Sequence, residues 1–149
     1  MKKYLLITFI LILGFSPSNA QQSVARRWNE VMLMAVRQDQ ARPPVQARNL
    51  YHVSLAMYDA WAVYVSYAKT CMLGKTIGGV LYPFTGIPPV AATDTVSFQE
   101  EAISYAAYRV LRQRYANSPN AFISLYRFDT LMNNLGYDIN ETATTYGTG

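Results

Sequence analysis

The sequence contains very few of the residues on which many protein functions depend. Among its 149 residues there is one cysteine, Cys71, and one histidine, His52. A single cysteine cannot form an intrachain disulfide, so stability must come from packing. A single histidine excludes a histidine-rich metal site, and a catalytic triad would have to be built around it. Charged residues make up 15% and apolar residues 51%, a balance that argues against intrinsic disorder.

Residues 1–20 have the three regions of a secretory signal peptide. Two lysines precede an apolar run at residues 4–15, and small Ser18 and Ala20 fit the −3 and −1 positions of a cleavage site. That run is short against the roughly 20 residues that span a membrane, which disfavours the alternative of a permanent anchor. We expect cleavage after Ala20, export to the periplasm or the exterior, and no stable membrane insertion of the mature chain.

The basic balance of the chain is small once this segment is removed. Formal charge falls from +4 for the whole chain to +2 for residues 21–149, which keep 11 basic and 9 acidic residues. Arg26 and Arg27 stand together, but no basic run of the length that marks nucleic-acid binding occurs. We therefore expect no nucleic-acid partner.

The remaining sequence predicts an all-α fold: a bundle of about four helices with one long irregular loop. We expect this bundle to be incomplete. Hydrophobic spacing predicts helices over residues 23–40, 45–67 and 96–115, and a fourth that ends at Gly136. The first is expected to stop at Arg42-Pro43-Pro44. Glycines and prolines predict a surface loop over residues 68–92, with a short extended pair. It is expected to pack through four apolar side chains: Leu81, Tyr82, Phe84 and Ile87.

Capping signals refine the last two predicted helices. Ser97 with Glu100 has the form of a capping box, with Ser97 as N-cap. Ser118-Pro119 is expected to open the fourth helix as N-cap and first position, and Gly136 to close it. The buried face of the fourth helix is predicted to hold Phe122, Leu125, Phe128 or Asp129, and Met132.

The second predicted helix carries two apolar stripes and one polar stripe. The apolar stripes are Leu50, Met57, Trp61 and Tyr64 on one side, and Tyr51, Leu55, Tyr58, Ala62 and Val65 on the other. The polar and small stripe is Asn49, His52, Ala56 and Asp59. We expect this last stripe to meet solvent or another domain.

No residue is assigned a catalytic, cofactor-binding or metal-binding role from the pattern alone. Asp59 lies seven residues after His52, about 10.5 Å along a helix, too far to orient the imidazole directly. Glu100 and Glu101 fit a helical first turn, where acids favour the positive helix end. No His-Glu-x-x-His or Glu-x-x-His pattern occurs. An isolated exported thiol such as Cys71 is expected to be buried rather than catalytic.

One stretch of the chain nevertheless has a distinctive sequence. Its segments are Ala25-Arg26-Arg27-Trp28-Asn29-Glu30, Ala35-Val36-Arg37, Ala41-Arg42-Pro43-Pro44, Ala47-Arg48-Asn49-Leu50-Tyr51-His52, Ser54, Ala56-Met57-Tyr58-Asp59-Ala60-Trp61 and Tyr64. They closely resemble the N-terminal helical region of vanadium-dependent haloperoxidase-like proteins, relatives of the type 2 phosphatidic acid phosphatases. Later segments that look similar are Gly78-Gly79, Pro83-Phe84-x-Gly86, and residues 129–138.

The resemblance implies a bundle of helices in which a C-terminal part holds vanadate or phosphate through a lysine, arginines and two histidines. The family's Lys-x6-Arg-Pro motif is not met, because counting from Lys75 reaches Tyr82-Pro83. The Ser-Gly-His motif and a second histidine are also absent from these 149 residues. No catalytic residue of the family can therefore be carried onto this chain.

The sequence thus predicts that residues 21–149 are the N-terminal helical domain of an exported haloperoxidase- or acid phosphatase-like enzyme. The domain itself is expected to be inactive and to bind no cofactor, vanadate being expected only for the full-length family. Its partner would be the missing C-terminal catalytic domain or a second copy of the chain. The alternative is a free-standing exported helical module that acts in binding or as a partner subunit.

Overall fold

A computed structural model describes residues 22–87 and 94–142 of the chain. The predicted signal peptide, residues 88–92 of the predicted loop and the last seven residues lie outside the described residues. The helices are α2 (Val24–Gln38), α3 (Pro43–Ala62), α4 (Thr95–Tyr115) and α5 (Ala121–Leu135), and the strands are β1 (Thr76–Ile77) and β2 (Val80–Leu81). The predicted helical bundle is confirmed.

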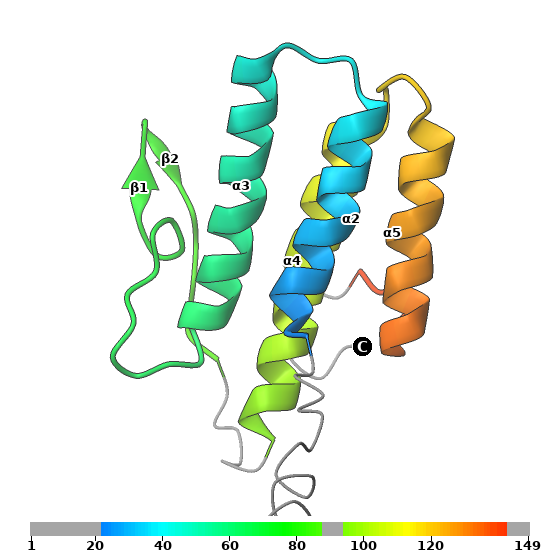
Figure 1. Cartoon of the computed structure of the whole chain (residues 1–149). Helices are drawn as coiled ribbons and strands as arrows, with labels where there is room; N and C mark the ends of the chain where they lie inside the picture. Colours follow the sequence, from blue (N-terminus) through cyan, green and yellow to red (C-terminus); the bar gives the residue numbers. More distant parts are fainter. Residues whose placement is uncertain (1–21, 88–93, 143–149) are drawn as a thin grey trace, which may run out of the picture.

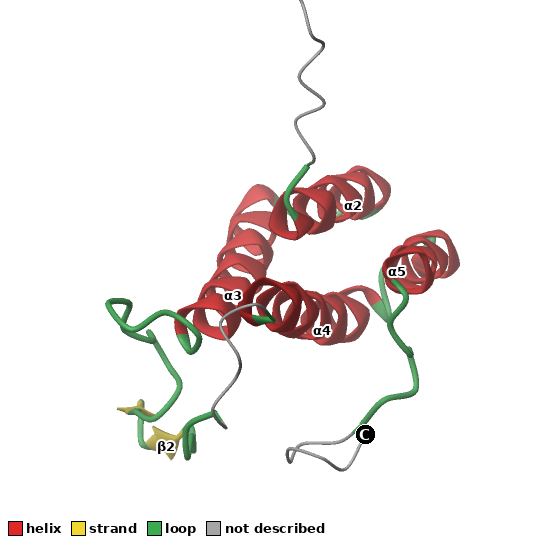
Figure 2. Cartoon of the chain, turned by 90° about the horizontal axis from the view of Figure 1, so that it is seen from below, coloured by secondary structure: helices red, strands yellow, loops and turns green. Residues whose placement is uncertain are grey.

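Helix α4 is the element around which the other helices are arranged (Figure 1). It contacts α2, α3 and α5, whereas α2 and α3 touch each other at few points. The view along the bundle shows α4 between α3 and α5, with α2 lying across from it (Figure 2). Fully buried side chains come from all four helices and form one core: Trp28, Met32, Val53, Leu111, Tyr115, Phe128 and Met132.

The boundaries of α2 and α3 follow the prolines, but not at the positions predicted. Helix α2 begins after Ser23, whose Oγ accepts from the amide of Arg26 at 3.3 Å. It ends at Gln38, ahead of the prolines as expected. Pro43 and Pro44 then open α3 rather than precede it, because proline fits the first helical positions, where no amide partner is needed.

The end of α3 differs more from the prediction. The helix stops at Ala62, five residues before the predicted end at residue 67. Turns follow, with the amide of Val65 donating to the carbonyl of Ala62 at 3.1 Å. These turns redirect the chain into the loop that packs beside α3.

The predicted capping box at the start of α4 is wrong. The helix begins at Thr95 after Asp94, and the carbonyl of Asp94 accepts from the amide of Phe98 at 3.1 Å. Ser97 is therefore already within the first turn and cannot act as N-cap. The helical hydrogen bonds start three residues earlier than the sequence motif suggests.

The start of α5 is also different from the prediction, while its end is as predicted. The hydroxyl of Ser118 donates to the carbonyl of Tyr115 at 3.0 Å, so it closes α4. Asn120, at a φ of 56°, precedes the first residue of α5. Gly136 closes α5 at a φ of 82°, with its amide bonded to the carbonyl of Asn133 at 3.0 Å. A positive φ is the conformation that favours glycine at this position.

The predicted buried face of α5 is correct at its centre and wrong at its start. Phe128 and Met132 are fully buried, but Phe122 is 73% exposed. Six residues separate Phe122 from Phe128, a rotation that places the two rings on different sides of a helix with 3.6 residues per turn. Ser124, one turn before Phe128, faces the core instead.

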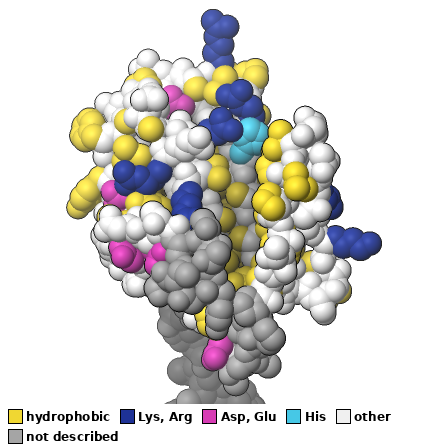
Figure 3. All heavy atoms as spheres, turned by 180° about the vertical axis from the view of Figure 1, so that it is seen from behind, with side chains coloured by type: hydrophobic (Ala, Val, Ile, Leu, Met, Phe, Trp, Pro, Cys, Tyr) yellow, Lys and Arg dark blue, Asp and Glu magenta, His cyan; other side chains and the backbone are white. Residues whose placement is uncertain are grey.

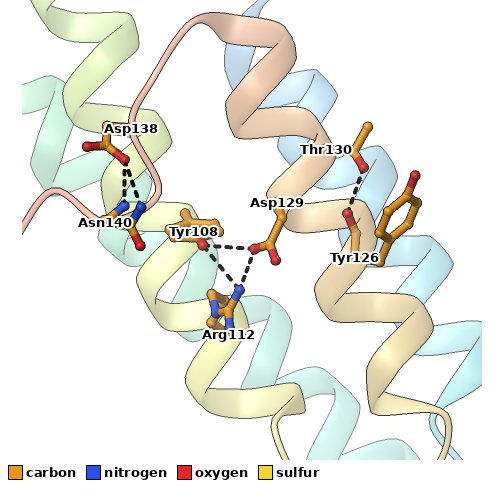
Figure 4. A network of polar contacts seen from close by, with 7 residues as sticks. All are labelled: Tyr108, Arg112, Tyr126, Asp129, Thr130, Asp138 and Asn140. Carbon is orange, nitrogen blue, oxygen red and sulfur yellow. Dashed lines mark hydrogen bonds and ion pairs between the residues drawn. The ribbon is translucent and has the colours of Figure 1, made fainter.

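Three polar side chains join α4 to α5 (Figure 4). Tyr108 donates its hydroxyl to Asp129 at 2.8 Å, and Arg112 forms an ion pair with the same carboxylate. Arg112 also donates to the Tyr108 oxygen at 3.2 Å. Burial and the bond to Asp129 raise the pKa of Tyr108. The carboxylate thus holds the two helices together beside the core.

Candidate functional site

The polar stripe of α3 is buried at its two ends and half-buried between them. Asn49 and Asp59 are 4% and 5% exposed, whereas Tyr51, assigned to an apolar stripe, is 62% exposed. The expectation that this stripe meets solvent is therefore wrong for Asn49 and Asp59, whereas His52 and Ala56 are half-buried and line a hollow on the surface. The stripe packs against α4 through small residues, and at its C-terminal end it meets the loop that follows α3.

Asp59 anchors that loop. Its carboxylate accepts from the backbone amides of Cys71 at 2.5 Å, Met72 at 2.8 Å and Leu73 at 3.0 Å. Hydrogen bonds to an ionised acceptor are among the stronger ones in proteins. Both oxygens of Asp59 are engaged with the loop, so this carboxylate does not orient His52.

The anchored loop borders a hollow of about 580 Å³ on the surface between α3 and α4. Its lining comes from three segments: His52, Leu55, Ala56, Asp59 and Ala60 of α3; Met72, Leu73 and Tyr82 of the loop; and Ala106, Val110, Gln113 and Arg114 of α4. Most of these side chains are apolar. Figure 3 shows apolar side chains along the floor of this face and basic side chains near the histidine at one end. A hollow of this size is within the usual range for small-molecule pockets.

The one histidine and an arginine form the polar end of the hollow. Arg114 Nη2 lies 2.6 Å from His52 Nδ1. Because a guanidinium only donates, Nδ1 must be the acceptor, and the imidazole is neutral in this arrangement. Partial burial, then the positive charges of Arg114 and Arg48, lower the pKa of His52 below its ordinary value of 6.5. All these effects favour the neutral ring at pH 7.

The described residues do not fit vanadate, the group implied by the resemblance. A highly charged oxyanion needs several cationic donors that converge on one point. Lys69 and Lys75 line a different hollow, beyond the end of α3, and Lys75 Nζ donates to the carbonyl of Thr70. The hollow that holds Arg114 also contains the carboxylate of Asp59, which would repel such an ion.

Other sequence candidates stay apart from this hollow. Cys71 is exposed, so the prediction that it is buried is wrong; its amide is held by Asp59, which leaves its side chain on the outside of the loop. Glu100 and Glu101 follow the first turn of α4, which begins at Thr95 and holds no acidic residue, so the prediction that they lie in a helical first turn is wrong. Within residues 22–87 and 94–142, no group of three or more His, Cys, Asp or Glu side chains is arranged to hold a metal ion.

The loop packs only in part as predicted. The two short strands pair antiparallel, with Thr76 opposite Leu81, which confirms the predicted extended pair. Tyr82 lines the hollow. Leu81 is 62% exposed and so does not pack as expected, whereas Phe84, 39% exposed, lines the hollow that holds Lys69 and Lys75, and Ile87 is half-buried. Each strand has only two residues, so the hairpin is too short to bury the side chains on both of its faces.

Sequence reasoning did not identify Arg114 or the anchoring role of Asp59. Arg114 is 62 positions from His52, so no spacing rule could pair them. Asp59 offered one signal: a carboxylate among aromatic and apolar neighbours near a helix end must find donors, and a glycine-rich loop follows it.

Searches of protein families, curated proteins and solved structures found no match to this chain. Of the helices in the described part of the chain, none is both long enough and apolar enough to cross a membrane.

Proposed function

We propose that this chain is the N-terminal scaffold of an exported enzyme that resembles vanadium-dependent haloperoxidases and acid phosphatases. The catalytic oxyanion site would belong to a C-terminal part of the enzyme, and the scaffold would supply helices against which that part packs. The proposal rests on one observation: residues on which the resemblance is based have structural roles in the fold.

Several of those residues build the fold. Trp28 fills the core with no exposure, Asn49 and Met57 are buried, and Asp59 holds the loop. A motif made of core and anchoring residues is what a scaffold requires. A catalytic motif would instead place titratable groups together in a pocket.

Exposed aromatic side chains favour a further packing partner. Phe122 and Tyr126 lie one turn apart on α5 and are 73% and 72% exposed. Adjacent exposed aromatic rings are common where one protein surface packs on another. A catalytic bundle that covers this side of α5 would bury both rings.

The test compares residues 21–149 with the longer protein specified by the coding sequence beyond the codon for Gly149. We expect that sequence to contain Lys-x6-Arg-Pro, Ser-Gly-His and a later histidine. The longer protein should oxidise bromide with peroxide and vanadate, or hydrolyse a phosphate monoester, and residues 21–149 should do neither. A stop codon directly after Gly149, or activity in residues 21–149 alone, would overturn the proposal.

A free-standing exported binding module is the second candidate. The hollow between α3, α4 and the loop favours it, because a binding module needs a site of its own. Sedimentation of residues 21–149 separates the two candidates. A scaffold with uncovered apolar faces should self-associate and bind an apolar dye, whereas an independent module should sediment as a monomer without binding the dye.

A further inference from the structure

The hollow between α3, α4 and the loop has a largely apolar floor. Ala56 and Ala60 on α3 face Ala106 on α4, and these small side chains leave space between the helices. Leu55 and Val110 add apolar surface. Such a floor binds the apolar part of a ligand and gains free energy in proportion to the area removed from water.

The two ends of the hollow differ in charge. At one end stand Arg114 and His52, joined at 2.6 Å, and the charge of Arg48 also acts on the imidazole. Asp59 lies two turns of α3 farther along, and its oxygens accept from three loop amides. An elongated ligand with one negative end would therefore be oriented, with that end at Arg114 and its apolar body toward the loop.

We propose that this hollow binds an apolar monocarboxylate, such as a fatty acid, whose carboxylate pairs with Arg114 and His52 and whose chain lies over the alanine floor. A guanidinium matches a carboxylate through two parallel hydrogen bonds. A single negative charge on the ligand suits the charges around the hollow, because the basic end lies opposite one carboxylate. This site does not depend on the proposed scaffold function.

Protonation of His52 gives the site a distinctive signature. In the free protein Nδ1 accepts from Arg114, whereas a bound carboxylate favours an imidazolium that donates. The charged and titratable groups around the ring are Arg48 of α3, Arg114 of α4, and Asp59 and Tyr82 across the hollow. Binding should therefore take up a proton, and affinity for a carboxylate should rise as pH falls from 8 to 6.

The test is calorimetric titration of the mature chain with decanoate and, as a neutral match, decanol. We expect decanoate to bind, and Arg114→Gln to weaken it about tenfold, in line with the loss of one charge-assisted hydrogen bond. Decanol affinity should change less than twofold. Arg37→Gln, which removes an equal charge from the exposed last turn of α2, is the matched control and should leave decanoate binding unchanged.

Several outcomes would overturn the assignment. These are no decanoate binding at millimolar concentration, equal loss in Arg37→Gln and Arg114→Gln, or decanoate affinity that does not change between pH 8 and pH 6. A second variant, Ala106→Leu, fills the floor and should weaken decanoate and decanol together. Because Arg114 is exposed, its replacement should not prevent folding, and circular dichroism of each variant checks this.

Discussion

Replacement of Asp59 by asparagine tests the role of the buried carboxylate most directly. Asparagine has nearly the same shape, but it offers one acceptor oxygen and one NH₂ donor in place of two acceptor oxygens. One oxygen of Asp59 receives the amide of Cys71 and the other receives those of Met72 and Leu73. In either orientation the new NH₂ group must face at least one backbone N–H.

The expected cost follows from these contacts. A hydrogen bond to a charged group contributes about 1.5–3 kcal/mol net, and the smaller loss, at Cys71, removes one such bond. We therefore expect Asp59→Asn to weaken loop attachment by about 2 kcal/mol. At about 1.4 kcal/mol per factor of ten, this is roughly a 30-fold increase in the opening equilibrium of the loop.

Hydrogen exchange measured by mass spectrometry is the appropriate assay, since the loop can open while the helical core stays folded. Amide exchange in residues 71–73 should accelerate roughly 30-fold in Asp59→Asn, and that of α4 should not change. Asp138→Asn is the matched control, because Asp138 is exposed and its carboxylate accepts hydrogen bonds from nearby Asn140, far from the loop that Asp59 holds. Unchanged exchange at residues 71–73 in Asp59→Asn would refute the anchoring argument.

Three further predictions concern the whole bundle, each checked by urea unfolding. Trp28→Ala should lower the free energy of unfolding by about 3–5 kcal/mol, because Trp28 is fully buried in the core; a loss below 1 kcal/mol would contradict its central place. Gly136→Ala should cost about 1 kcal/mol through the positive φ of the helix end, and an unchanged midpoint would argue against that conformation. Stability should fall as pH rises above about 10, because burial raises the pKa of several tyrosines above 10.0 and the folded protein then keeps phenol protons that the unfolded chain releases. These tyrosines are Tyr64, Tyr105, Tyr108, Tyr115 and Tyr137. A flat profile from pH 8 to pH 11 would contradict this last prediction.

The sequence predicts the helices of this protein better than it predicts their ends or faces. Periodic apolar residues and the glycine at position 136 locate the helices because both signals are local. The predicted starts of α4 and α5 are wrong because Ser97 and Ser118 fit the capping pattern, whereas the helices begin after Asp94 and Asn120. A serine motif contributes about 1 kcal/mol, less than the burial of one large side chain.

The candidate site could not be predicted from short sequence patterns, for a different reason. The buried face of α3 includes Asn49 and Asp59, which a hydrophobic pattern assigns to the surface. Their burial depends on partners contributed by other segments, such as the loop amides for Asp59. Likewise, His52 is part of the candidate site only because the fold places Arg114 of α4 beside it.

The position of α4 also determines when the chain can fold during synthesis. Since α2 and α3 make few contacts with each other, residues 22–62 have almost no core of their own until α4 is available to both. Folding must then wait until residue 115 has emerged, and the loop between α3 and α4 has to close, at an entropic cost that grows only slowly with its length. A chain ending before residue 95 should remain unfolded, whereas one ending after α4 should already form the contacts of α2 and α3 with α4.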